Sequence, residues 1–245
     1  MNQNDFNMDR YQVAPGAVSS SESAVSKSFL FNVYNWMAMG LAITGVIAYG
    51  LVAYFGESEI FVFFQTNTFA LIFLIILQLG LVLLLSFALQ KIPTIVAYGA
   101  FLLYSALTGV TMSTIFVLYT GTSIAATFFV CAGMFLSVSV FGYITKMNLS
   151  KFGTFLFMGL IGLVIASVVN IFLNSSTLEW IISYVGVLLF VGLTAYDTQK
   201  IKRMAMSLDA NSEEGKKASI FGALMLYLDF INLFLFLLRI MGDRK

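Results

Sequence analysis

The chain has 245 residues, of which 60% are hydrophobic and only 10% are charged, and its mean hydropathy is +0.93. An ordinary soluble domain carries about 25% charged residues, because its surface faces water. This composition excludes an ordinary soluble domain and indicates a surface that faces lipid. The formal net charge of +1 gives no large field to attract nucleic acid or an acidic substrate, so we expect no nucleic-acid partner.

The scarcity of histidine and cysteine limits the chemistry open to the chain. There is no histidine, which excludes His-based catalytic triads and imidazole metal sites. Cys131 is the single cysteine, so an intramolecular disulfide is impossible. Acid–base or ion chemistry must therefore use carboxylates, amines, hydroxyls and the backbone, and we expect no cofactor.

Apolar runs dominate the chain after a polar beginning. Residues 1–28 are polar and serine-rich, which predicts a flexible N-terminal tail and not a signal peptide. Runs long enough to cross about 30 Å of hydrocarbon then recur. Because lipid cannot pair with backbone polar groups, runs of this length are typical of helices. The sequence predicts an all-α integral membrane protein with one seven-helix domain over residues 29–245. The expected spans are 29–55, 69–90, 94–118, 122–144, 153–173, 178–204 and 219–240.

Basic residues are distributed unevenly between the connections of these spans. The side with the N-terminal tail and the connections after the second, fourth and sixth spans holds 10 of the 13 Lys and Arg residues. The opposite side holds three, all near the C-terminus. Because cytoplasmic loops are enriched in Lys and Arg, the N-terminus is expected in the cytoplasm. The length of the last run predicts that it crosses the membrane and does not turn back.

Small residues recur at helical spacing in three of the spans. The pattern is typical of tight helix packing, because small side chains let two backbones approach closely. A hinge or a pore lining is the functional alternative. The residues are Gly40, Gly45, Gly133, Ser137, Gly159, Gly162 and Ala166.

Two aspartates lie inside predicted spans. Asp229 is near the middle of the last span, and Asp197 is in the part of the sixth span nearer the cytoplasm. A carboxylate at the centre of a membrane helix costs about 3 kcal/mol, so it is expected to face a partner or a water-filled cavity. At a rise of 1.5 Å per residue their depths differ by about 6 Å. The sequence therefore predicts that the two aspartates meet on facing helices.

A meeting of these carboxylates would have chemical consequences. Two unit charges about 4 Å apart repel by roughly 4 kcal/mol at an effective dielectric near 20. The pair would then share one proton, which makes it sensitive to pH. Calcium would remove the same repulsion and compete with protons. Asp197 and Asp229 are thus the predicted pH-sensing and calcium-binding residues. The alternative is that Lys200 satisfies Asp197, while Asn232 or Ser105 satisfies Asp229.

Other polar residues within the spans are candidates for a gate or a water path. Ser105, Thr108 and Thr111 form a stripe on the third span, and Asn170 lies deep in the fifth. Hydrogen bonding within and between helices explains most such residues. The candidate gating or pore-lining residues are Lys91, Ser105, Thr108, Asn170 and Asn232.

Two segments carry a resemblance to a known family. Tyr196–Ile201 (YDTQKI) and Leu226–Phe234 (LYLDFINLF) resemble the paired aspartate motifs of the Bax inhibitor family. Val33–Met37, Phe141–Lys146 and Phe157–Gly162 are also similar to segments of that family. The likeness covers about residues 28–241 and resembles a bacterial-type member.

The resemblance implies a seven-helix bundle in which the last helix is surrounded by the other six. It also implies a pH-dependent calcium leak in the bacterial inner membrane, with Asp197 and Asp229 as sensor and ion site. Its partners would be lipid, calcium and protons, and no partner protein is identified. Some members have an arginine near the inner end of the second helix that binds the aspartates. Here Gln90 and Lys91 stand there, and a lysine supplies charge without the fork of arginine.

Two other functions are open to a pair of membrane aspartates. Intramembrane aspartyl proteases also carry Tyr-Asp in the sixth helix, and two carboxylates sharing a proton can activate water. Those proteases have Gly-x-Gly-Asp in the seventh helix and a later Pro-Ala-Leu. Here Leu226–Leu228 precede Asp229, and no proline follows Pro93, so we expect no enzyme. The third function is a non-transporting scaffold that regulates another membrane protein.

Overall fold

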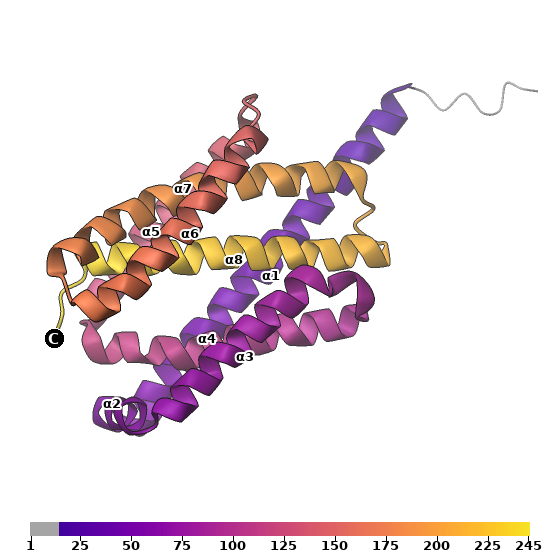
Figure 1. Cartoon of the computed structure of the whole chain (residues 1–245). Helices are drawn as coiled ribbons and strands as arrows, with labels where there is room; N and C mark the ends of the chain where they lie inside the picture. Colours follow the sequence, from indigo (N-terminus) through magenta and orange to yellow (C-terminus); the bar gives the residue numbers. More distant parts are fainter. Residues whose placement is uncertain (1–14) are drawn as a thin grey trace, which may run out of the picture.

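The computed structural model describes the backbone of residues 15–245 and the side chains from residue 27 onward. The described chain is almost entirely helical (Figure 1). Seven helices, all except α2 and η2, are long and apolar enough to span a membrane, which confirms the predicted fold class. The elements are α1 (Pro15–Phe55), α2 (Glu57–Thr66), α3 (Thr68–Phe87), η2 (Leu89–Lys91), α4 (Thr94–Leu118), α5 (Gly121–Ile144), α6 (Ser150–Leu173), α7 (Ser176–Ser207) and α8 (Glu213–Met241).

The predicted spans agree with the helices to within a few residues, except at the start of α1. That helix begins at Pro15, inside the segment for which a flexible tail is predicted, and its first turns extend beyond the rest of the bundle (Figure 1). Residues 1–14 lie outside the described residues, so the flexible tail stays a prediction. The last helix is continuous from Glu213 to Met241, as expected for a run that crosses and does not turn back.

Helix α2 is an element that the sequence analysis did not predict. It has ten residues, which is too short to cross a bilayer, and it lies between the predicted spans 29–55 and 69–90. Gly56 separates it from α1 with a φ of +86°, a conformation that residues with a Cβ rarely adopt. Glu57 and Glu59 lie in its first turn, where negative charge stabilises the helix dipole.

Helix α8 is the most buried span. In its most apolar stretch of 18 residues, 67% of the residues are buried, whereas the share in every other span is at most 39%. It packs against α1, α4, α5 and α7, and in Figure 1 it runs between α7 on one side and α4 on the other. Among the described helices, α3 packs mainly on α4, and α6 packs on α7. That all six other spans surround α8 stays a prediction.

The seven spans give the bundle two ends. The first, here called the basic end, carries the start of α1 and the connections that follow α3, α5 and α7. The second, the C-terminal end, carries α2, the connections that follow α4 and α6, and the C-terminus. At the basic end, Gln199 holds the connection between α5 and α6: its Nε2 donates to Met147 O (2.8 Å), and its Oε1 accepts from Leu149 N (2.9 Å).

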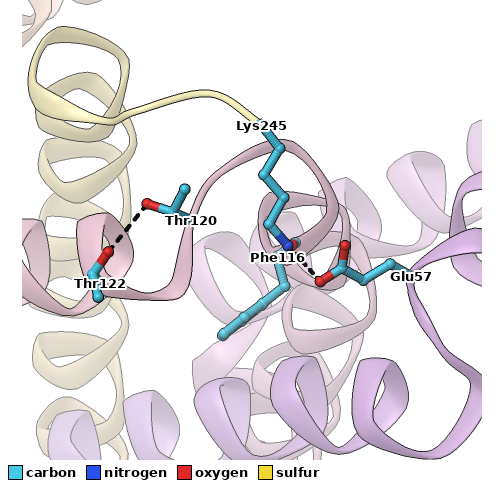
Figure 2. A network of polar contacts seen from close by, with 5 residues as sticks. All are labelled: Glu57, Phe116, Thr120, Thr122 and Lys245. Atoms are coloured by element: carbon cyan, nitrogen blue, oxygen red, sulfur yellow. Dashed lines mark hydrogen bonds and ion pairs between the residues drawn. The ribbon is translucent and has the colours of Figure 1, made fainter.

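Residues 242–245, here called the C-terminal strap, fasten the other end. The strap pairs with the corner between α4 and α5: Thr120 N donates to Asp243 O (3.1 Å), and Lys245 N donates to Leu118 O (3.0 Å). Figure 2 shows Lys245 Nζ reaching Glu57 of α2 and the carbonyl of Phe116. The strap therefore joins α2, α4 and α5 at one point.

Close helix packing occurs at glycines, but mostly not at those in the predicted stripes. A Cβ at Gly40 or Gly159 would lie within 3.0 Å of a neighbouring side chain, as predicted. At Gly45, Gly133 and Gly162 no described atom lies within 4 Å of that position, so the prediction is wrong there. The reason is that spacing identifies one face of a helix without identifying what that face meets.

The closest crossing joins α5 to α7 at Gly142. A Cβ at Gly142 would lie 2.5 Å from Ala195 O and 3.0 Å from Ala195 Cα. Both atoms belong to the backbone of α7, which cannot move aside as a flexible side chain can. The crossing brings α5 close to α7 just before Asp197.

We expect Gly142→Ala to destabilise the protein by about 1–3 kcal/mol, because the added methyl group overpacks the crossing. Thermal unfolding in detergent micelles measures the effect. Gly133→Ala in the same helix is the matched control and should be neutral or slightly stabilising, since alanine favours a helix over glycine by up to about 1 kcal/mol. Equal melting temperatures for Gly142→Ala and Gly133→Ala would contradict the close crossing.

Candidate functional site

Asp229 lies in the middle of α8, in the best-shielded part of the bundle. Its side chain is only 4% exposed. Its Oδ2 is fully buried and has no hydrogen-bond partner among the described residues. A buried polar atom without a partner costs about 1–3 kcal/mol, and such atoms are rare enough in native proteins to need an explanation.

Asp197 lies on α7, which packs along α8. Its side chain is half-buried. Asp197 and Asp229 therefore lie on two helices that pack directly against each other.

The residues proposed to satisfy each aspartate separately are engaged elsewhere. Lys200 forms no ion pair with Asp197 among the described residues; its Nζ lies 3.7 Å from Met225 Sδ and 5.3 Å from the ring centre of Phe221. Asn232 Nδ2 donates to Leu228 O (2.8 Å), and Ser105 Oγ donates to Phe101 O (2.9 Å). None of these three residues donates a hydrogen bond to a carboxylate in the described part of the chain.

Two further buried oxygens share the lack of a partner. They are Ser139 Oγ on α5 and Thr198 Oγ1 on α7. Together with Asp229 Oδ2 they are the buried side-chain atoms without a hydrogen bond in the described part of the chain. They come from three helices that contact one another pairwise. Unpaired oxygen is thus concentrated in the α5–α7–α8 part of the bundle.

A second polar cluster, fully paired, lies on the other side of α8. Tyr227 Oη is 2.6 Å from Thr44 Oγ1. Thr44 Oγ1 is 2.9 Å from Ser105 O and 3.0 Å from Gly40 O. Since Thr44 has one hydroxyl proton for these two carbonyls, Tyr227 is the donor in its bond to Thr44. The cluster joins α8 to α1 and α4 through Tyr227, which lies two residues before Asp229 in the sequence.

Thr44 and Tyr227 are not among the site residues predicted from the sequence. Tyr227 belongs to the quoted LYLDFINLF motif, so its position beside Asp229 was the available signal. Thr44 is a single threonine on α1 and had no such signal in the sequence, because its importance depends on which face of α1 meets α8. Ser105 and Thr108, which were candidates for a water path, are buried, and their hydroxyls donate to Phe101 O and Tyr104 O one turn earlier in α4.

The other candidate residues lie apart from the two aspartates. Lys91 is exposed in η2 at the basic end, and its side chain forms no hydrogen bond or ion pair with the described residues. Lys200, and not Lys91, lies on the same helix as Asp197, three residues later. Asn170 lines a cavity of about 530 Å³ at the C-terminal end. A gating role for Lys91 or Asn170 stays a prediction.

The chemistry open to the aspartate region is that of oxygen ligands. No group of three or more acidic, Cys or His side chains gathers anywhere in the described residues. Two carboxylates provide at most four of the six to eight oxygens that calcium takes. Hydroxyls, carbonyls or water would have to provide the others. This donor set fits a weakly held cation better than a permanently bound one.

Comparison with known proteins supports the resemblance seen in the motifs. The model of the family described as "Inhibitor of apoptosis-promoting Bax1" matches residues 26–245. The chain is 48% identical to the inner membrane protein YbhL of Escherichia coli (strain K12), over 97% of this chain and 100% of YbhL. It is 46% identical to an uncharacterized protein of Borreliella burgdorferi, over 91% of this chain and 95% of the relative.

The family match covers every span, the two aspartates and the C-terminal strap. The relatives are matched over nearly their whole length, so the likeness is not confined to one motif. These matches and the seven apolar helices agree. The chain is an integral membrane protein that belongs to the Bax inhibitor family.

Proposed function

We propose that the chain is a pH-sensitive calcium leak channel in which Asp197 and Asp229 form the ion site. One observation carries the proposal: Asp229 is buried in the most buried span, one of its oxygens has no partner among the described residues, and its helix packs against α7, which carries Asp197. An ionisable side chain at this depth is costly to keep, so it is expected to serve the passage of ions or protons. Membership of the family supports the same function.

Calcium is the cation that suits this donor set. It accepts carboxylate, hydroxyl, carbonyl and water oxygens in flexible geometry, and the neighbouring helices offer the free hydroxyls of Ser139 and Thr198. A complete cage of acidic ligands would trap the ion, whereas conduction requires binding weak enough for release. Two carboxylates therefore favour a leak over a storage site.

Sensitivity to pH follows from the same pair. Two carboxylates that share one ion site repel each other when both are ionised, and either a proton or a divalent cation removes the repulsion. Protons and calcium therefore compete for the pair. As the pH falls, protonation removes the negative charge that attracts calcium, so calcium affinity should fall with it.

The distribution of basic residues supports an orientation with the N-terminus in the cytoplasm. In the described part of the chain the basic end carries nine of the 12 Lys and Arg residues, and Lys and Arg are enriched on the cytoplasmic side. We propose the bacterial inner membrane as the location, because YbhL is named an inner membrane protein. The C-terminal strap would then lie on the far side of that membrane.

Calcium flux through the purified protein tests the function. Proteoliposomes that contain the full chain and a calcium-sensitive dye should take up calcium at a rate that changes between pH 5 and pH 8. Asp229→Asn should abolish the change with pH, because the pair then loses its shared proton. Asp209→Asn removes the same charge from an exposed aspartate in the connection between α7 and α8, so its pH response should equal that of the wild type.

Wild-type vesicles as tight to calcium as empty vesicles at every pH would refute the leak. The same preparation distinguishes the protease alternative, which requires cleavage of a membrane peptide that is lost in Asp197→Asn. The structure gives that alternative little support, since α8 is a continuous helix around Asp229. An extended substrate strand would have to approach past Leu226 and Leu228.

The unpaired oxygen of Asp229 also predicts an effect on stability. Asp229→Leu should raise the free energy of unfolding by about 1–3 kcal/mol, because it replaces an unsatisfied buried polar group with an apolar one of similar size. Thermal unfolding in detergent without calcium measures the change. Asn232→Leu on the same helix is the control and should give no such increase, since Asn232 already has a partner in Leu228 O. A destabilised Asp229→Leu would show that the carboxyl group has a stabilising partner.

A further inference from the structure

The C-terminal end of the bundle contains a cavity that the aspartate pair does not use. Its volume is about 530 Å³, within the range of small-molecule sites. Its polar lining residues come from the end of α4, from α6 and the connection after it, from α7, α8 and the strap: Tyr119, Ser167, Asn170, Asn174, Glu179, Arg239 and Arg244. Arg239, Arg244 and Glu179 also line a neighbouring cavity of about 310 Å³.

The charges of this lining are not balanced. Arg244 Nη2 forms an ion pair with Glu179 Oε1 at 2.9 Å. The charge of the one carboxylate that lines the cavity is therefore already neutralised by Arg244. The side chain of Arg239 forms no ion pair or hydrogen bond with the described residues, and its guanidinium lies 5.5 Å from the ring centre of Phe236. One positive charge is therefore left over, on a side chain that lines both cavities.

The free polar groups of the cavity are mostly donors. The Oδ1 of Asn170 accepts from Ser175 N at 3.1 Å, which leaves its NH₂ group without a described acceptor. Ser167 uses its hydroxyl proton on Leu163 O (2.8 Å). Arg239 has five N–H donors and no acceptor. The unused groups of the cavity include the guanidinium of Arg239, the NH₂ group of Asn170 and the side-chain amide of Asn174, so donors outnumber acceptors and suit an anion with several acceptor oxygens.

We infer that this cavity binds a phosphate group, with Arg239 as its main contact. The planar fork of arginine matches two phosphate oxygens at once. The strap takes part, because Arg244 holds Glu179 and keeps that carboxylate from competing for Arg239. The apolar part of the lining consists of Ile115, Leu118, Ile171, Ile182, Leu235 and Leu238. The phosphate is either the free ion or part of an anionic lipid headgroup. Binding at this cavity does not depend on the proposed aspartate pair.

Binding of radiolabelled inorganic phosphate to the purified full chain is the first arm of the test. Equilibrium dialysis in detergent, with ionic strength held constant by chloride, should give saturable binding of one phosphate per chain. Arg239→Gln should weaken this binding at least about tenfold, because a charge-assisted hydrogen bond is lost. Lys151→Gln is the control: it removes one positive charge from an exposed side chain at the basic end, and its binding should equal that of the wild type.

The second arm uses mixed micelles that contain phosphatidylglycerol or phosphatidylcholine, with bound lipid counted by native mass spectrometry. Retention of phosphatidylglycerol by the wild type, again at least about tenfold weaker in Arg239→Gln, identifies the headgroup as the source. Asn170→Ala leaves both arginines in place and should weaken whichever ligand binds, so the test survives if Arg239→Gln does not fold. Absence of saturable binding in both arms, or equal binding by the wild type and both cavity variants, overturns the inference.

Discussion

The burial of α8 is the constraint on which the rest of the structure depends. Lipid cannot solvate a carboxylate, so a helix with an aspartate near its middle needs protein around that residue. Asp229 is shielded because α8 packs against α1, α4, α5 and α7. The helices that contact α8 less, α3 and α6, turn most of their side chains outward, and only 6% of the most apolar window of each is buried. Burial and lipid exposure are thus divided between helices, not only between the faces of each helix.

The two sides of α8 have opposite characters. Toward α1 and α4, the hydroxyls of Tyr227, Thr44 and Ser105 all have partners, and such a network fixes the rotation of α8 about its axis. In the α5–α7–α8 part of the bundle, Ser139, Thr198 and Asp229 each have a buried side-chain oxygen without a hydrogen-bond partner. A fully paired network stabilises, whereas unpaired buried oxygen costs stability and is retained where function requires it. The proposal of an ion site on the α5–α7 side rests on this difference.

The sequence was sufficient for the spans and insufficient for the contacts between them. Seven runs could be predicted because each is long enough to cross the hydrocarbon core. Helix α2 could not, because its ten residues are too few to cross that core. The aspartates were identifiable as charges in an apolar run. The close approach at Gly142 was not, because it depends on Ala195, more than 50 positions away. Thr44 was missed for the same reason, since its partner Tyr227 lies at the other end of the chain.

The continuity of α8 bears on the kind of transport that the aspartates can support. Many transporters bind ions at broken helices, where unwound backbone carbonyls serve as ligands. Helix α8 is unbroken from Glu213 to Met241, so its carbonyls near Asp229 are occupied by its own hydrogen bonds. A cation beside Asp229 must then rely on side chains and water. Such a site holds its ion weakly and has no hinge at the binding residue, which favours passive leak over a transport cycle driven by the bending of α8.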